Sequence, residues 1–174
     1  IYEDSRGMLW IEAYDGSYRC FNPYREEFYP IPGESDSTFL PRFTHFYESD
    51  NGTICLSTEK SGVLFFRFEN LDEPPVAVHL MNRPAEEQVL TGNEVNFVVQ
   101  DKNRYLWIGT GSGLTRIHED DLDQEHPRVL KYFTERSFTA CEKVGERLWF
   151  GNNINGVTWY DPSGERFGNI RSGD

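Results

Sequence analysis

Short apolar runs of about five residues, separated by polar turns, recur along the chain and predict β-strands. One run, LWIGT at 106–110, follows the polar turn Asp101-Lys102-Asn103 and precedes a second run, LTRI, at 114–117. Asp, Asn and Gly favour tight hairpin turns, because they tolerate positive φ or hydrogen-bond their own backbone. Helical periodicity is nearly absent, and NRPAEEQVL at 82–90 could form one or two helical turns at most.

The same pattern occurs four times. The repeats start at Ile1, Phe46, Val98 and Ala140, and their central positions are Trp10, Cys55, Trp107 and Trp149, spaced by 45, 52 and 42 residues. An aliphatic residue precedes each central position, and a glycine follows it by six or seven residues: Gly16, Gly62, Gly113 and Gly156. Four matches at one near-constant period indicate a repeat protein.

Each repeat has room for a further, weaker strand after the third one. These candidates are EEFYP at 26–30, PVAVHL at 75–80, RVLKYF at 128–133 and RFGNI at 166–170. Four strands in a period of this length are typical of a propeller blade. We therefore predict an all-β fold of about four four-stranded antiparallel meanders, a fragment of a larger β-propeller, with blades at about 1–42, 43–92, 93–135 and 136–174. Such a fragment would either close as a small ring or pair with a second copy.

Three alternating glycines, Gly109, Gly111 and Gly113, raise the alternative of a phosphate-binding loop. That loop requires a helix directly after it, so that backbone N–H groups and the helix dipole converge on the anion. A strand of about four residues follows here instead, and the GK[ST] ending is missing. The glycines are therefore predicted to form a turn between two strands.

Composition limits the partners and the chemistry. The formal net charge is −12 and no Lys/Arg run occurs, which argues against a nucleic-acid partner. Cys20, Cys55 and Cys141 have no metal-ligand spacing, and no cofactor motif is present, so we expect neither metal nor cofactor. No apolar run reaches the length of a membrane helix. The chain does not begin with Met, and we interpret it as a piece of a longer protein.

At these motifs the chain resembles the two-component-regulator propeller repeat, whose pattern is I-x-E-D-x-x-G-x-L-W-I-G-T-x-x-G-L. The first repeat carries Ile1, Glu3, Asp4, Gly7, Leu9, Trp10, Ile11 and Gly16, and the third carries Asp101, Leu106, Trp107, Ile108, Gly109, Thr110, Gly113 and Leu114. The second has Cys55 in place of Trp, and the fourth lacks the Asp and shifts the turn.

The resemblance implies a place in the periplasmic sensor region of a hybrid two-component histidine kinase of the Bacteroides type. Its parent would be anchored in the inner membrane and would carry the kinase domain outside this chain. Propellers of this family are seven-bladed, and the ligands sensed are typically oligosaccharides. The resemblance thus implies an oligosaccharide and neighbouring blades of the parent chain as partners, and a homodimer is a further option.

No residue pattern singles out a catalytic site. A G-x-S-x-G elbow is absent, and acidic residues are numerous without one spacing that marks a glycosidase pair. His118 with Glu119, Asp120, Asp121, Asp123 and Glu125 could form a cation or acid–base cluster. A solvated loop between the third and fourth strands is the favoured interpretation of that segment.

Ligand contact is best predicted at positions that vary among the repeats. In propellers the turn between the second and third strands shares a face with the blade-to-blade connection. This face would carry Tyr14, Asp15, Glu59, Lys60, Ser112, Asn152, Asn153 and Asn155. Amides, carboxylates and an aromatic ring suit a hydroxyl-rich ligand. We therefore predict a non-catalytic sensory segment that senses oligosaccharides or relays a signal. The alternatives are an architectural or dimerisation propeller without a small-molecule ligand and a propeller polysaccharide hydrolase or lyase.

Overall fold

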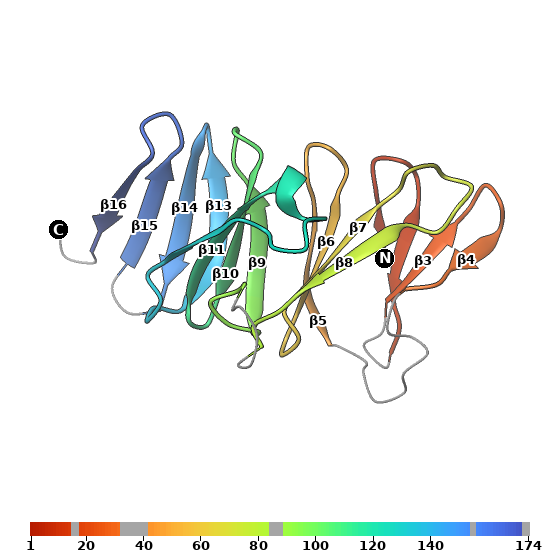
Figure 1. The fold of residues 1–174 in the computed structure, drawn as a ribbon, viewed down its shortest axis with the longest axis horizontal. Helices are drawn as coiled ribbons and strands as arrows, with labels where there is room; N and C mark the ends of the chain where they lie inside the picture. Colours follow the sequence, from red (N-terminus) through yellow and green to blue (C-terminus); the bar gives the residue numbers. More distant parts are fainter. Residues whose placement is uncertain (15–17, 32–41, 84–88, 154–155, 172–174) are drawn as a thin grey trace.

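The computed structural model describes residues 1–14, 18–31, 42–83, 89–153 and 156–171, and it consists of a row of four antiparallel sheets (Figure 1). Blade 1 contains β1 (Tyr2–Glu3), β2 (Leu9–Glu12), β3 (Tyr18–Asn22) and β4 (Glu27–Tyr29), and blade 2 contains β5 (Phe43–Glu48), β6 (Ile54–Thr58), β7 (Val63–Arg67) and β8 (Val76–Leu80). Blade 3 contains β9 (Val95–Gln100), β10 (Tyr105–Thr110), β11 (Gly113–His118) and β12 (Val129–Tyr132), and blade 4 contains β13 (Phe138–Val144), β14 (Arg147–Asn152), β15 (Gly156–Asp161) and β16 (Arg166–Ile170).

Every sheet is a meander, because each strand pairs only with its neighbours in the sequence. The single helical element in the described ranges is a 3₁₀ turn, η1 (Glu119–Asp121), between β11 and β12. None of the described helices is long and apolar enough to cross a bilayer. The all-β prediction of four-stranded antiparallel meanders is confirmed.

The glycine triplet forms the hairpin between β10 and β11. Gly109 lies in β10, Thr110 is its last residue, and Gly113 begins β11 with a φ of +139°, which a side chain would strain. The register runs from Thr110↔Gly113 to Tyr105↔His118 without interruption. A strand follows the glycines, as predicted, so the phosphate-loop alternative is excluded at this position.

Three apolar layers hold the sheets together. Residues of blades 1 and 2 share a layer that includes Trp10, Cys20, Ile54, Leu64 and Phe66. The layer between blades 2 and 3 includes Cys55, Phe65, Leu106, Ile108 and Ile117, and the layer between blades 3 and 4 includes Trp107, Leu114, Leu148, Phe150 and Tyr160. Strands of the middle blades are buried on both faces, which is why their sequences are continuously apolar rather than alternating.

Strand β10 shows how one blade serves two layers. Leu106 and Ile108 contact blade 2, while Trp107 between them contacts blade 4. Successive side chains of a strand point to opposite faces, so the central Trp of a repeat faces the next blade along the chain. Trp10 in blade 1 does the same toward blade 2, and both indoles are 0% exposed.

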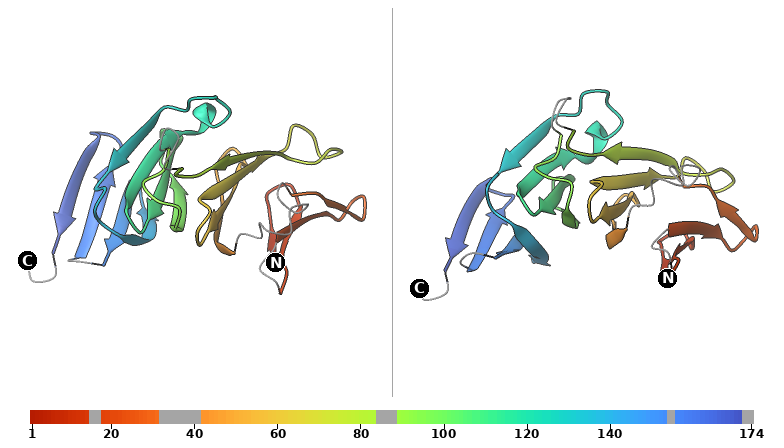
Figure 2. Two further views of the ribbon diagram at one scale, coloured as in Figure 1. Left: turned by 60° about the horizontal axis from the view of Figure 1, so that its bottom comes forward. Right: turned by 90° about the horizontal axis from the view of Figure 1, so that it is seen from below.

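The four blades form an open arc (Figure 2), with blade 1 and blade 4 at its opposite ends. The expectation of a small closed four-bladed ring is therefore wrong. As a result, one flank of blade 1 and one flank of blade 4 are left uncovered by the described residues.

Candidate functional site

Among the described residues, the turns between the second and third strands of blades 2 and 3 lie beside the connection that leads into blade 3, along the lower edge of Figure 1. Backbone hydrogen bonds join the two kinds of loop: Gly111 N–H donates to Glu94 O at 3.2 Å, Gly62 N–H to Asn93 O at 2.9 Å, and Asn153 N–H to Ser137 O at 3.4 Å. We call this edge the connection face. The edge at the other end of the strands carries η1 and the first hairpin turn of each blade, and we call it the hairpin face.

The predicted ligand residues that the structure describes are all at or next to turns of the connection face. Tyr14, Glu59, Lys60, Ser112 and Asn153 are exposed, and Asn152 is half-buried at the end of β14. Asp15 and Asn155 lie outside the described residues. Blades 1 and 3 each present one of these residues and blades 2 and 4 present two, so a ligand would have to reach across neighbouring turns to meet several of them. Their role in binding stays a prediction.

A pocket of about 250 Å³ lies elsewhere, on the outer rim between blades 2 and 3. Its wall combines β8 with the segment after η1, and it includes Val78, Leu80, Met81, Arg83, Leu122 and Glu125. None of the predicted ligand residues that the structure describes lines it. The connection between β8 and β9 contributes the Arg83 and Val89 part of this wall.

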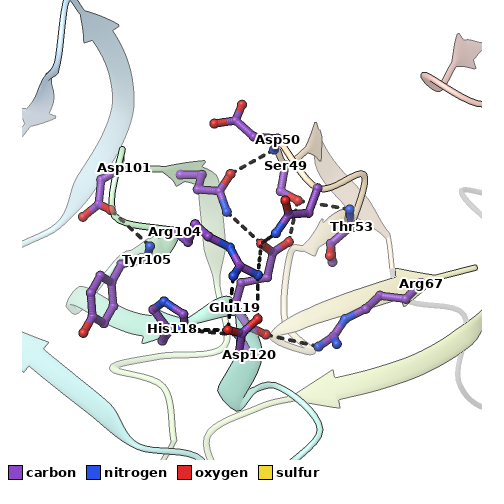
Figure 3. Close-up of polar contacts among 12 residues, drawn as sticks. Ser49, Asp50, Thr53, Arg67, Asp101, Arg104, Tyr105, His118, Glu119 and Asp120 are labelled. Atoms are coloured by element: carbon purple, nitrogen blue, oxygen red, sulfur yellow. Dashed lines mark hydrogen bonds and ion pairs between the residues drawn. The ribbon is translucent and has the colours of Figure 1, made fainter.

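The segment from His118 to Glu125 differs from its favoured interpretation at one residue. Asp120 and Asp123 are exposed as expected of a solvated loop, but the Glu119 side chain is only 3% exposed. Glu119 begins η1, whose first turn is capped by the His118 ring accepting a hydrogen bond from Asp120 N–H. The short helix turns the Glu119 side chain inward between blades 2 and 3 (Figure 3). The solvated-loop interpretation is wrong for this carboxylate.

The Glu119 carboxylate accepts hydrogen bonds from both blades. Ser49 Oγ donates to Oε1 at 2.5 Å, while Asn51 Nδ2 and Gln100 Nε2 donate to Oε2 at 2.7 and 3.0 Å. The Arg104 guanidinium lies 3.6 Å from the same oxygen. Figure 3 shows these donors converging on the carboxylate. Both oxygens are therefore satisfied inside the protein.

Two opposed effects set the protonation state of Glu119. Burial raises the pKa of the carboxyl, whereas the hydrogen bonds from Ser49, Thr53, Gln100 and Asn51 lower it. The combined effect of the hydrogen bonds exceeds that of burial, because all of them favour the charged form. The pKa of Glu119 therefore lies below its ordinary value of 4.5. Glu119 is therefore an anion at neutral pH, and both of its oxygens accept hydrogen bonds that join two blades. These properties do not fit a general acid or base.

The reason for this arrangement lies in the repeat itself. In blade 3, Asp101 Oδ1 accepts hydrogen bonds from Asn103 N–H and Tyr105 N–H, and Oδ2 accepts one from Trp107 Nε1 at 2.9 Å. Asp4 and Trp10 repeat this pattern in blade 1, also at 2.9 Å. One carboxylate thus closes the first turn and holds the indole of the second strand.

Blade 2 lacks both members of that pair, with Ser49 and Cys55 in their places. Ser49 Oγ still accepts a hydrogen bond from Thr53 N–H at 3.0 Å, so the turn is closed without the carboxylate that the other two blades use. Glu119 of the next blade supplies the missing carboxylate. Cys55 lies near this carboxylate. Burial of the thiol raises its pKa most, and the negative charge of Glu119 raises the pKa further.

A second buried charge lies between blades 3 and 4. The Arg116 guanidinium lies 3.7 Å from the centre of the Tyr105 ring and 5.4 Å from that of Trp107. It donates to Glu165 of blade 4 at 3.2 Å. In the described part of the chain no group of His, Cys, Asp and Glu is arranged to hold a metal ion. Glu119 and Arg116 thus tie neighbouring blades together.

Comparison with known proteins supports the same family of repeats. The family described as Two component regulator propeller matches residues 89–112, which include β9 and β10. Histidine kinase P4 from Formosa agariphila is 26% identical over 104 residues, which make up 59% of this chain and 7% of that protein. The chain therefore spans only a small part of this relative.

Two solved structures share the fold. The extracellular domain of a protein described as a one component system of B. thetaiotaomicron superposes with a TM-score of 0.64 at 21% identity, over 100% of this chain and 24% of that one. A catalytically inactive virginiamycin B lyase from Staphylococcus aureus, solved with quinupristin, gives a TM-score of 0.65 at 15% identity, over 99% of this chain and 55% of that one.

Proposed function

We propose that this chain is a non-catalytic sensory segment of a periplasmic β-propeller in a two-component signalling receptor. The observation that carries the proposal is the match of residues 89–112 to the two-component-regulator propeller repeat, in a chain whose four blades repeat one meander. The similarity to a histidine kinase over more than half of the chain supports the same class. In this proposal the parent protein carries the membrane anchor and the kinase outside the chain.

The ligand proposed for this segment is an oligosaccharide bound on the connection face. Glu59 and Lys60 of blade 2, Ser112 of blade 3 and Asn153 of blade 4 offer a carboxylate, an ammonium, a hydroxyl and an amide there. Tyr14 adds an exposed aromatic ring in blade 1. Such groups bind sugar hydroxyls through paired hydrogen bonds and stack on pyranose faces.

Signal relay in this proposal uses small rigid shifts between blades, because packed interfaces switch between arrangements more readily than they deform. The interface between blades 2 and 3 suits this role. Its Glu119 hydrogen bonds are directional, and they join the first turn of blade 2 to η1 of blade 3. A ligand that bridges Lys60 and Ser112 would act on the other end of the same two blades.

Binding to an oligosaccharide array, followed by calorimetry with the best ligand, tests the proposal. Lys60→Ala and Asn153→Ala are expected to weaken binding at least about tenfold if each removes one charge-assisted or paired hydrogen bond. Asp50→Ala is the matched control, because Asp50 is an exposed carboxylate on the hairpin face. Failure of every oligosaccharide to bind, or equal weakening by the Asp50 variant, would contradict the proposed site.

An enzymatic function is the alternative that the lyase-like fold raises, although similarity at 15% identity concerns the fold alone. The buried charged residues Glu119 and Arg116 are paired within interblade contacts, which supports a non-catalytic segment. Incubation with a panel of polysaccharides distinguishes the two functions. The proposal requires that no reducing ends or unsaturated products form above the level of a heat-denatured sample.

A further inference from the structure

The pocket of about 250 Å³ between blades 2 and 3 has no part in the oligosaccharide proposal. Blades 2 and 3 are the two middle blades of the arc, and each of them packs against a neighbouring blade on both sides. The residues that line the pocket come from these two blades and from the connections next to them. The pocket is therefore formed within the row of blades, away from both of its ends.

The floor of the pocket is apolar. Val78 and Leu80 of β8 pair with Phe65 and Val63 of β7, on the side of blade 2 that faces blade 3. Leu122, directly after η1, belongs to the same apolar layer from the blade 3 side and is 1% exposed. The pocket thus lies at the outer edge of this layer, where an apolar group of a ligand would be removed from water.

Polar and charged side chains surround this floor. Arg83 follows β8 on the blade 2 side, while Gln124 and Glu125 belong to the segment between η1 and β12 on the blade 3 side. Arg83 and Glu125 are exposed. The rim therefore combines a guanidinium from one blade with a carboxylate from the other. Such a site is complementary to a small molecule that carries an anion, a cation and an apolar group.

We propose that this pocket binds a free α-amino acid with an apolar side chain. The carboxylate of the ligand pairs with Arg83, because a guanidinium offers two parallel N–H donors to a carboxylate. The ammonium group of the ligand pairs with Glu125, and its side chain lies on Val78, Leu80 and Leu122. This site is separate from the connection face and does not depend on an oligosaccharide.

The size of the pocket limits the ligand further. Sites for drug-sized ligands have volumes of about 300–1,000 Å³, so a pocket of about 250 Å³ takes a smaller molecule. Leucine and phenylalanine are small enough, whereas a peptide of several residues is too large. The proposal therefore concerns single amino acids.

Hydrogen bonds hold both sides of the rim in place. On the blade 2 side, Asn93 Oδ1 accepts from Asn82 N–H at 2.6 Å, and Asn93 Nδ2 donates to Asn82 O at 2.8 Å. On the blade 3 side, the Gln124 backbone and side chain donate to Asp121 at 3.2 and 2.9 Å. Asn82 and Gln124 directly precede the two charged rim residues. A rim that is fixed before binding loses less conformational entropy when the ligand binds.

Titration of the ¹⁵N-labelled chain with L-leucine and with L-phenylalanine, followed in two-dimensional ¹H–¹⁵N spectra, tests the proposal. The backbone amide signals of Leu80 and Leu122 should shift and reach saturation. Arg83→Ala should weaken binding at least about tenfold, because it removes the charged partner of the ligand carboxylate. Arg128→Ala is the matched control, because Arg128 is exposed and does not line the pocket. The dispersion of each spectrum verifies folding, and Arg83→Gln replaces Arg83→Ala if that variant is unfolded.

Two analogues of leucine test the two charged contacts separately. Leucinamide lacks the carboxylate and 4-methylpentanoate lacks the ammonium group, so each should bind at least about tenfold more weakly than leucine. The Arg83→Ala variant should bind leucine and leucinamide about equally, because the partner of the carboxylate is gone. The Glu125→Ala variant should likewise bind leucine and 4-methylpentanoate about equally.

Three results would overturn the proposal. The first is the absence of shifts at Leu80 and Leu122 with either amino acid up to about 5 mM, since the proposed contacts should give at least millimolar affinity. The second is binding of the two analogues as tight as that of leucine. The third is loss of leucine binding in Lys60→Ala, which would locate the amino acid on the connection face. Unchanged leucine binding in that variant is expected, whatever the result for oligosaccharides.

Discussion

Trp107 Nε1 donates a hydrogen bond of 2.9 Å to Asp101 Oδ2, and Trp10 makes the same bond to Asp4 at the same distance. In both blades the other carboxylate oxygen accepts two backbone N–H groups of the first turn. The spacing of six residues between Asp and Trp therefore has a structural explanation. The carboxylate fixes the hairpin and the orientation of the indole that packs on the next blade.

Replacement of Asp101 should destabilise the fold more than its turn position suggests. Asp101→Ala leaves the buried Trp107 N–H and two turn N–H groups without their acceptor, which should cost about 2–4 kcal/mol in the free energy of unfolding. Asp101→Asn keeps one carbonyl acceptor and should cost less. Urea denaturation followed by tryptophan fluorescence measures both. Asp50→Ala serves as the control, and a similar loss in that variant would contradict the account.

Gly109 and Gly151 occupy corresponding positions in β10 and β14, and they should respond differently to substitution. A Cβ at Gly109 would lie 2.1 Å from Cζ of Phe97, a buried ring stacked on Phe150, so Gly109→Ala should cost about 1–3 kcal/mol. A Cβ at Gly151 would have its nearest neighbour, Ala140 Cβ, at 3.7 Å. Gly151→Ala should therefore remain within about 0.5 kcal/mol of wild type. Thermal unfolding of the two variants compares them directly, and equal losses would contradict this packing.

The Glu119 carboxylate predicts a pH dependence of stability. Its pKa in the folded protein lies below the ordinary value of 4.5, so its contribution is present above pH 4.5 and is lost as the pH falls through the folded value. Glu119→Gln should be less stable than wild type at pH 7, by about 1–3 kcal/mol. The difference between the two proteins should shrink below pH 4.5. Urea titrations from pH 3 to pH 8 measure it, and a difference that is constant over this range would contradict the assignment.

The cysteines should be nearly inert in the folded protein. Burial raises the pKa of Cys20 and of Cys141 to about 12, and burial and the Glu119 charge raise that of Cys55. Since the thiolate is the reactive form, a disulfide reagent at pH 8 should label these thiols slowly and should label all three at once in urea. Absorbance of the released thiol measures the rate. Rapid native labelling of Cys55 would contradict its place between blades 2 and 3.

The repeat made most of the fold predictable. The period of the Trp positions and the hairpin residues at the first turns were enough to predict four meanders, because these features act within one blade. The positions of Glu59, Lys60 and Asn153 at turns followed in the same way. The sequence does not predict whether these turns bind a ligand, because the polar residues of a sugar-binding site are also common in ordinary surface turns.

Contacts between blades were harder to predict. Glu119 and Ser49 are 70 residues apart, and their contact was not predicted from the sequence, although Ser49 and Cys55 replace the Asp and Trp of the first and third repeats. The same limit applies to Trp149. Its place in the repeat predicts a buried indole, but its burial depends on what covers the end of the arc.

Hydrogen exchange of the four indole N–H groups tests the central claim, that equivalent tryptophans lie in equivalent layers between neighbouring blades. Two-dimensional ¹H–¹⁵N spectra, assigned by single Trp→Phe substitutions, should show slow exchange for Trp10 and Trp107 and fast exchange for Trp149 and Trp159. Fast exchange at Trp107, or unequal protection of Trp10 and Trp107 in the folded chain, would contradict the account.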